Sequence, residues 1–321
     1  KEYLTDFADN SNIIAEKTKF VIDDVYIEIK ITIGISSPQK TATYKNDPKS
    51  IVADASIALK NAKKEMRPYQ VFNESLDTRN EYSKNIEISK KLKKALQTGN
   101  IIAHYQPIQD INTKITEKYE LLLRLIDENG SIISPLFFLE IAKKGRQYEA
   151  LTKIAIKNAF EAAKKTGKNF SVNLSYEDIS NKSLTNFLFD ILSESGVGDK
   201  ITFEILESES IKDYSKLQGF ISELKQFGCK VAADDFGAGY SNFEHLIHLD
   251  LDYIKIDGSI VKNILTNDSS KIIAQTIVEF AKKLNIKTVA EYVSSEEIYD
   301  AVKEIGVDYA QGYYVGKPII L

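Results

Sequence analysis

The chain has 321 residues, 43% of them hydrophobic, and a formal net charge of −4. This length predicts more than one domain with a large core, and the slightly acidic charge argues against a broad nucleic-acid or membrane surface. One cysteine, Cys229, excludes an intrachain disulfide and indicates a reducing compartment. No apolar run reaches the roughly 18 residues of a membrane span. Because the chain begins at Lys1 without Met, we expect a fragment of a longer protein, and a sensor or membrane segment upstream stays open.

Residues 1–73 read as a small mixed α/β region. Stretches 20–29 and 30–36 alternate apolar and polar residues with the period of strands. A helix is predicted over 48–65 and a short closing strand over 69–72. The pair Asp23-Asp24 favours a turn between strands, because no partner carboxylates accompany it.

Residues 74–98 predict a charged, amphipathic helical connector. Its apolar positions include Ile88, Leu92 and Ala95, and Gly99 follows as a helix stop. A continuous helix between two domains acts as a semi-rigid lever, which is one conceivable route for coupling them.

From Ile101 to the end, within a predicted domain of residues 99–321, short apolar runs alternate with helical patterns. Helices are expected over 151–165, 186–195, 213–227 and 268–284. Eight strands joined by helical crossovers favour an α/β fold of the (β/α)8 TIM-like barrel type over an open sheet. The expected strands are 101–105, 118–125, 169–174, 201–206, 230–233, 253–256, 288–290 and 308–311.

Polar residues sit inside or just after these apolar runs, about one per β/α unit. A barrel brings the carboxyl ends of its strands together, so these side chains are expected at one site. Carboxylate and amide oxygens suit hard cations such as Mg²⁺ or Mn²⁺, and a lysine among them suits a phosphate or an activated water. The pattern therefore indicates two-metal phosphodiester hydrolysis. The residues are Glu120, Asn173, Glu204, Asp234, Asp235, Lys255, Asp257, Glu291 and Gln311.

Each of these residues alone has an ordinary structural explanation. An isolated Asp-Asp pair is most often a solvated turn, Lys255 an ion-pair partner and Arg124 a surface residue. His104, His245 and His248 occupy no position that needs an imidazole, and no nucleophile elbow is present. Only the ordered recurrence of the polar residues favours a catalytic site.

At these motifs residues 92–321 resemble the EAL domain, a family of cyclic di-GMP phosphodiesterases in bacterial second-messenger signalling. The name-giving Glu-Ala-Leu reads Glu120-Leu121-Leu122 here, and the most distinctive match is Asp234-Asp235-Phe236-Gly237. The other matching motifs begin at Tyr105, Asn173, Glu204, Lys255, Ala290 and Gln311.

The resemblance implies a role for each matching residue. Asp234 bridges two metals, Asp235 holds the second, and Asp257 and Glu291 lie near it. Lys255 orients or activates the attacking water, and Glu207 holds the glycine loop that follows Asp235. Arg124 grips a substrate phosphate. The first metal is bound by Glu120, Asn173, Glu204 and Asp234, and the nucleotide groove is lined by Gln106, Leu122, Gln311 and Tyr313.

Four positions depart from the family pattern. Tyr292 replaces a glycine, which costs the backbone its easy access to positive φ. Ser294 replaces a carboxylate, Leu206 a threonine, and Gly316 a common serine. We expect an intact metal site with slow turnover, and a higher rate when glycine is restored at position 292.

Residues 1–73 resemble the C-terminal part of a GGDEF domain, the cyclase partner that often precedes EAL domains. The nucleotide-gripping Gly-Gly-Asp-Glu-Phe hairpin is absent from this sequence, so this part is expected to supply no cyclase catalysis.

Two functions remain open on the sequence. The first is hydrolysis of cyclic di-GMP to linear pGpG with two Mg²⁺ or Mn²⁺ ions per site. The second is a catalytically weak EAL domain that binds cyclic di-GMP as a receptor. For either we expect a cytoplasmic location, a homodimer through the EAL domain and no nucleic-acid polymer as partner.

Overall fold

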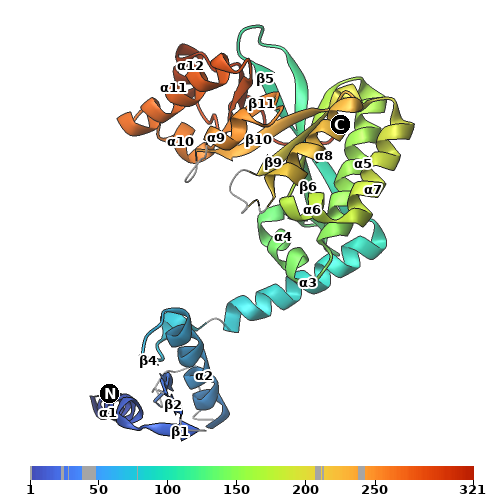
Figure 1. Cartoon of the computed structure of the whole chain (residues 1–321). Helices are drawn as coiled ribbons and strands as arrows, with labels where there is room; N and C mark the ends of the chain where they lie inside the picture. Colours follow the sequence, from blue (N-terminus) through green and yellow to red (C-terminus); the bar gives the residue numbers. More distant parts are fainter. Residues whose placement is uncertain are drawn as a thin grey trace. The chain divides into compact units, whose positions relative to one another are not determined.

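The computed structural model describes residues 2–22, 25–27, 29–37, 48–77, 79–206, 211, 213–237 and 243–321. The chain forms two compact units, Lys1–Glu87 and Ile88–Leu321, which are treated separately below (Figure 1). None of the described helices combines the length and the apolar character needed to cross a bilayer.

The first unit contains two small sheets. Strands β1 (Phe20–Ile22) and β2 (Val25–Ile27) pair antiparallel, and β3 (Ile33–Ile35) pairs parallel with β4 (Tyr69–Val71). The crossover between β3 and β4 includes helix α2 (Pro48–Lys64), which packs on β3. A Cβ at Gly34 would lie 2.1 Å from the Ala55 carbonyl oxygen, so only glycine permits this close approach.

The sequence analysis did not predict the first helix, α1 (Glu2–Lys17). The predicted helix 48–65 and strand 69–72 are present, and the stretch 20–29 is divided into β1 and β2. Asp23-Asp24 lies outside the described residues. The expected connector begins as a short 3-10 turn, η1 (Glu74–Leu76), followed by helix α3 (Arg79–Thr98). Gly99 ends that helix with φ +74°, as the stop signal predicted.

The second unit is a closed eight-stranded barrel surrounded by helices (Figure 1). All eight predicted strands form, and a two-residue strand β7 (Ile132–Ile133) is added outside the ring against β6. The ring consists of β5 (Ile101–Asp110), β6 (Thr116–Ile126), β8 (Asn169–Leu174), β9 (Ile201–Leu206), β10 (Lys230–Phe236), β11 (Tyr253–Ile256), β12 (Lys287–Ala290) and β13 (Tyr309–Gln311).

The helices fall between these strands along the chain. The four predicted helices correspond to α5, α7, α8 and α11, each within a few residues of the expected ends. The helices and 3-10 turn are α4 (Pro135–Lys144), α5 (Tyr148–Thr166), α6 (Tyr176–Ser180), α7 (Lys182–Ser195), η2 (Gly198–Lys200), α8 (Tyr214–Gln226), α9 (Phe243–Ile247), α10 (Gly258–Lys262), α11 (Asp268–Lys283) and α12 (Glu296–Ile305).

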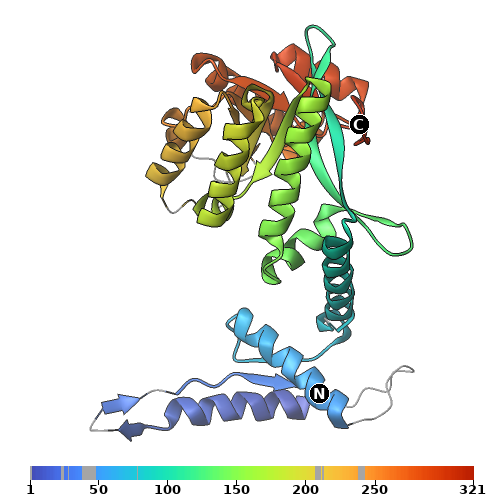
Figure 2. The ribbon, with the colours of Figure 1, turned by 90° about the vertical axis from the view of Figure 1, so that its right-hand side faces the viewer.

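The first strand departs from the expected topology. β5 runs antiparallel to both of its neighbours, β6 and β13, whereas the other ring pairs are parallel. The first two strands therefore form a hairpin and are not joined by one of the helical crossovers expected for the barrel as a whole. Figure 2 shows the two long strands lying side by side.

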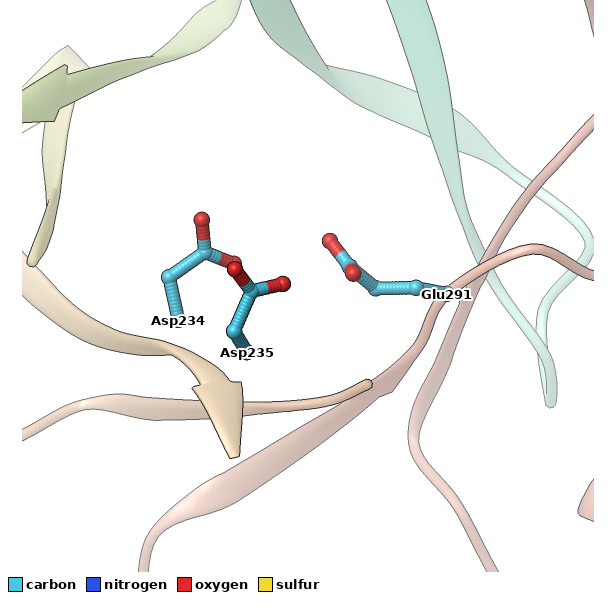
Figure 3. A group of neighbouring side chains, drawn as sticks. All are labelled: Asp234, Asp235 and Glu291. Atoms are coloured by element: carbon cyan, nitrogen blue, oxygen red, sulfur yellow. The ribbon is translucent and has the colours of Figure 1, made fainter. Parts of the chain in front are cut away.

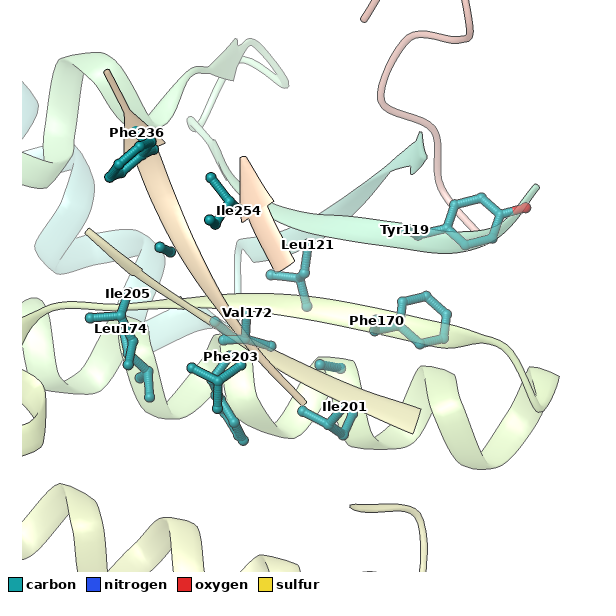
Figure 4. Packing of buried hydrophobic residues seen from close by; sticks show 14 of the residues in the cluster. Tyr119, Leu121, Phe170, Val172, Leu174, Ile201, Phe203, Ile205, Phe236 and Ile254 are labelled. Atoms are coloured by element: carbon teal, nitrogen blue, oxygen red, sulfur yellow. The ribbon is translucent and has the colours of Figure 1, made fainter. Parts of the chain in front are cut away.

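Side chains alternate between the barrel interior and the surrounding helices, as the period of two residues requires. On β8 and β9 the apolar positions face the helices, whereas Ser171, Asn173, Thr202 and Glu204 occupy the alternate positions. Large apolar side chains thus fill the outer layer while the interior keeps polar ones. Figure 4 shows this outer layer, with Phe170, Val172, Leu174, Ile201, Phe203, Ile205, Phe236 and Ile254 among its members.

Candidate active site

The adjacent aspartates lie beside an irregularity at the carboxyl end of β10. Ala233 pairs with Ile254 and Phe236 with Ile256, so β10 has one extra residue between these pairings. Asp235 has φ +55°, in the left-handed region that aspartate tolerates better than most residues. A bulge of this kind breaks the alternation of side chains along a strand. Both carboxylates can therefore face the same site.

Glu291, directly after β12, faces this aspartate pair (Figure 3). One carboxylate oxygen from each of Asp234, Asp235 and Glu291 lies within 4.8 Å of the others. Side chains from two strands that are not adjacent in the ring thus converge at its carboxyl end.

Lys255 is almost fully buried on β11, with 1% of its surface exposed. Its Nζ lies 2.6 Å from Glu204 Oε2, 2.7 Å from Glu291 Oε1 and 2.8 Å from Asp234 Oδ1. Glu120 Oε2 is farther, at 3.7 Å. The lysine therefore ties carboxylates from four different strands or strand ends to one point.

Glu120, on β6, is held by two amide side chains. Asn173 Nδ2 donates to Glu120 Oε1 at 2.8 Å, and Gln311 Nε2 donates to Glu120 Oε2 at 2.5 Å. The same Gln311 nitrogen lies 3.4 Å from Gln106 Oε1. The turn that follows β8 is stabilised by a capping box, in which the side chains of Ser175 and Asp178 each accept a hydrogen bond from the backbone nitrogen of the other residue. Strands β5, β6, β8 and β13 thus contribute to one polar network.

Burial and mutual repulsion disturb the ionisation of these acids. Burial raises the pKa of Glu291 to about 8, against the opposing effect of Lys255. Burial, followed by the charges of Asp234 and Asp257, raises the pKa of Asp235 to about 6. Burial also raises the pKa of Glu204 well above its usual range. For Lys255, burial lowers the pKa but the surrounding carboxylates outweigh it and raise the pKa well above the ordinary value.

The donor set fits divalent cations. Four carboxylates contact the Lys255 ammonium group and a fifth, that of Asp235, lies beside Asp234 and Glu291, so acidic groups outnumber the one cation among them. Asp234 Oδ1 is buried and, within the described part of the chain, accepts no hydrogen bond, since its contact with Lys255 lacks hydrogen-bond geometry. Oxygen ligands and uncompensated charge are the conditions that Mg²⁺ and Mn²⁺ satisfy.

A cavity of about 250 Å³ opens beside these acids. All four side chains expected to line the nucleotide groove border it, as do Arg124, expected to hold a phosphate, and the acids Glu120 and Glu291. Arg124 is half-buried there, and burial lowers its pKa, although the neighbouring Tyr313 and Glu120 oppose that effect. The lining residues are Gln106, Glu120, Leu122, Arg124, Glu291, Tyr292, Ser294, Gln311, Gly312, Tyr313 and Pro318.

One further predicted residue that the structure describes, Asp257, lies beside Asp235 at the edge of this network. Asp257 caps helix α10, where its carboxylate accepts hydrogen bonds from the backbone nitrogen of Ser259, at 2.9 Å, and from the Ser259 hydroxyl. The charge of Asp257 also contributes to the raised pKa of Asp235. Glu207 lies outside the described residues, as do 238–242 of the glycine loop.

The cavity also contains residues that sequence reasoning did not place there. Pro318 and Gly312 line it, and the C-terminal segment is bonded to β5 through two backbone hydrogen bonds between Tyr105 and Ile319. A Cβ at Gly312 would lie 2.1 Å from the Val293 carbonyl oxygen, which requires glycine. The motif that contains Gly312 could have indicated that this residue lies in the cavity, whereas nothing in the sequence indicated the same for Pro318.

Comparison with known proteins places the site in context. A family model described as "EAL domain" matches residues 89–318. The "Cyclic di-GMP phosphodiesterase PdeB" of Shewanella oneidensis is 28% identical over 320 residues, covering 95% of this chain and 37% of that protein. The "Cyclic di-GMP phosphodiesterase PdeA" of Borreliella burgdorferi is 31% identical over 231 residues, covering 70% of this chain and 34% of that protein. The chain thus spans about a third of the length of these relatives.

Solved structures give the same picture. An EAL domain protein from Listeria monocytogenes EGD-e is similar with a TM-score of 0.67 and 26% identity, covering 72% of this chain and 93% of that one. The FimX EAL domain from Pseudomonas aeruginosa, bound to c-di-GMP, has a TM-score of 0.67 and 25% identity, covering 73% and 96%.

Proposed function

Because the chain belongs to the EAL-domain family over residues 89–318, we propose that it hydrolyses cyclic di-GMP to linear pGpG in bacterial second-messenger signalling. One observation carries this proposal. A single cavity joins the expected nucleotide-binding side chains to the acidic cluster around Lys255. Relatives named as cyclic di-GMP phosphodiesterases support the same activity.

The proposed metal ligands follow from the donor set. We propose that Asp234 would be shared by two Mg²⁺ or Mn²⁺ ions and that Asp235 would hold the second of them, with Asp257 and Glu291 nearby. When bound, these ions supply Lewis-acid charge and lower the pKa of a coordinated water. The first ion is assigned to Glu120, Asn173, Glu204 and Asp234.

The remaining residues of the chain bind and orient the substrate. Arg124 is proposed to hold a phosphate, because its planar guanidinium fits phosphate oxygens and its half-buried position strengthens the attraction. Gln106, Leu122, Gln311 and Tyr313 are proposed to line the groove for the nucleotide.

Lys255 and Glu207 are proposed to serve catalysis in different ways. The Lys255 ammonium keeps its proton, since the surrounding carboxylates raise its pKa, and it donates from Nζ to orient the attacking water. Glu207 is assigned the task of holding the glycine loop after Asp235, as the family resemblance implies.

A receptor role is the second candidate, and one observation favours it. Tyr292 borders the cavity with φ +58° at a position where the family pattern has glycine. A bulky side chain in that conformation is strained. Slow turnover with retained binding is the behaviour that this role requires.

A chromatographic assay separates the two functions. Cyclic di-GMP is incubated with the protein in Mg²⁺ or Mn²⁺, beside Glu120→Gln and the matched control Glu117→Gln, an exposed position on the same strand. The phosphodiesterase proposal expects pGpG from the wild type and the control and none from Glu120→Gln. Calorimetric binding without product in either metal would instead make the chain a receptor.

Three further properties belong to the proposal. Cyclic di-GMP is an intracellular messenger, which supports a cytoplasmic site of action. A homodimer through the EAL domain is expected, and light scattering on the purified chain tests it. A GGDEF-like origin for the first unit and an upstream sensor are proposed from the sequence resemblance alone.

A further inference from the structure

Tyr292 has an unusual backbone conformation for an aromatic residue. Its φ of +58° lies in the left-handed region, which disfavours bulky side chains. Such outliers persist only where surrounding contacts hold them, and they concentrate at functional sites.

Two contacts fix one side of the ring. The Lys262 ammonium lies 3.5 Å from the ring centroid, a cation–π contact. A Cβ at Gly258 would lie 3.0 Å from Tyr292 Cβ and 3.3 Å from Cγ, so the absence of a side chain at 258 makes room for the tyrosine. The ring is thus held in one orientation before any ligand arrives.

The rest of the ring is open and borders the cavity. Tyr292 is 57% exposed, and it lines the same cavity as Arg124 and Tyr313. Tyr292 and Tyr313 follow neighbouring strands, β12 and β13. The cavity lining therefore combines two aromatic side chains with the Arg124 guanidinium, an arrangement that suits a ligand with planar bases and phosphates.

We propose that the Tyr292 ring is a stacking surface for one purine base of the bound cyclic dinucleotide. This inference rests on the proposed function, because it takes cyclic di-GMP as the ligand. A ring already held by Lys262 and Gly258 loses little freedom when a base stacks on it, which favours binding. The hydroxyl has no part in stacking, so the aromatic ring is the feature that binds.

The test uses two substitutions that distinguish the effect of the aromatic ring on binding from the effects of side-chain size and backbone strain. Tyr292→Phe keeps the ring, and Tyr292→Leu keeps a large side chain in the same conformation without aromaticity. Calorimetry with cyclic di-GMP in Ca²⁺, with chromatography to check for product, gives the dissociation constants. The Phe variant is expected to bind within about twofold of wild type, and the Leu variant roughly 5- to 150-fold more weakly, as the loss of one base stack predicts.

A second measurement does not depend on the Leu variant folding. The chain has no tryptophan, so Tyr292→Trp creates a single fluorescent reporter that a stacked guanine should quench. Phe137→Trp is the control, since Phe137 is also exposed but does not line the cavity.

The outcomes separate the two proposals. Wild-type protein that neither binds nor hydrolyses cyclic di-GMP overturns the proposed function. Wild-type binding with an equally tight Leu variant, or quenching of the Tyr292→Trp reporter no greater than that of the control, overturns the stacking role and leaves the proposed function intact.

Discussion

Replacing Lys255 with methionine tests the electrostatic balance of the site. Methionine keeps the length of the side chain but removes the cation that three carboxylate oxygens contact within 2.8 Å. Removing one partner of a buried ion pair costs about 3–5 kcal/mol. Because about 1 kcal/mol shifts the melting temperature of a domain this size by roughly 2–4 °C, the metal-free variant should melt roughly 6–20 °C lower.

The loss should depend on pH in a definite direction. The pKa of Glu291 is about 8 in the folded protein and that of Glu204 is also raised, whereas an unfolded glutamate titrates near about 4.3. Between these values the folded state holds more protons than the unfolded state, so its stability falls as pH rises. Without Lys255 this fall should steepen, and the variant should approach wild-type stability as pH decreases from 8.

Differential scanning calorimetry in EDTA at pH 6, 7 and 8 measures both effects. Lys287→Met is the matched control, because Lys287 pairs with Asp308 at the surface and is 59% exposed; such a pair contributes about 0–1 kcal/mol. Mn²⁺ should restore much of the lost stability of Lys255→Met by supplying the missing positive charge. A variant that melts with the wild type in EDTA at pH 8 would refute this reasoning.

Three other substitutions have definite expected outcomes. Tyr292→Gly should raise kcat and add about 1 kcal/mol of stability by relieving left-handed strain; an unchanged kcat in the pGpG assay would show that the tyrosine does not slow turnover. Asp252→Asn removes the charge from a carboxylate that accepts a hydrogen bond from the Val231 backbone nitrogen at 2.7 Å. Urea titration should show that the free energy of unfolding falls by about 1.5–3 kcal/mol, while the folded variant keeps its activity. A loss of activity in the folded variant would contradict a purely structural role. Glu149 has its pKa lowered to about 2, chiefly by hydrogen bonding to Lys153. It therefore contributes stability above about pH 4.3 that is lost as the pH falls toward 2, and Glu149→Gln should flatten the acid limb of the stability profile, which an unchanged limb would disprove.

Much of the barrel could be predicted because its alternation is simple. Polar residues inside the strands, such as Glu120, Glu204 and Lys255, interrupt runs of apolar residues. Because parallel strands present their carboxyl ends at one edge, chain order alone was enough to expect these side chains together. The cavity residues Arg124 and Tyr313 followed only from the family resemblance.

Other features depend on geometry that residue types do not specify. The bulge at Asp235 leaves no mark in the sequence, since aspartate is common in both extended and left-handed conformations. The antiparallel course of β5 was hidden because the predicted strands were too short: strands at 101–105 and 118–125 leave residues 106–117 between them, enough for a crossover. The strands that form are longer, so only residues 111–115 join β5 to β6, too few for a crossover helix. Helix α1 was missed although a signal was present, because Leu4, Phe7 and Ala8 recur at helical spacing.

The reversed direction of β5 determines where the preceding chain meets the barrel. In an all-parallel barrel, the segment before the first strand arrives at the end remote from the catalytic loops. Here Ile101 pairs with Leu125 and Ile102 with Arg124, at the carboxyl end of β6. The last turns of α3 accordingly lie at the same end of the barrel as the candidate site, where Lys91 contacts Asp127 at 3.3 Å. Only Gly99, Asn100 and Ile101 separate the end of this helix from Ile102, the strand residue opposite Arg124, so the chain that precedes the barrel joins it beside the candidate site.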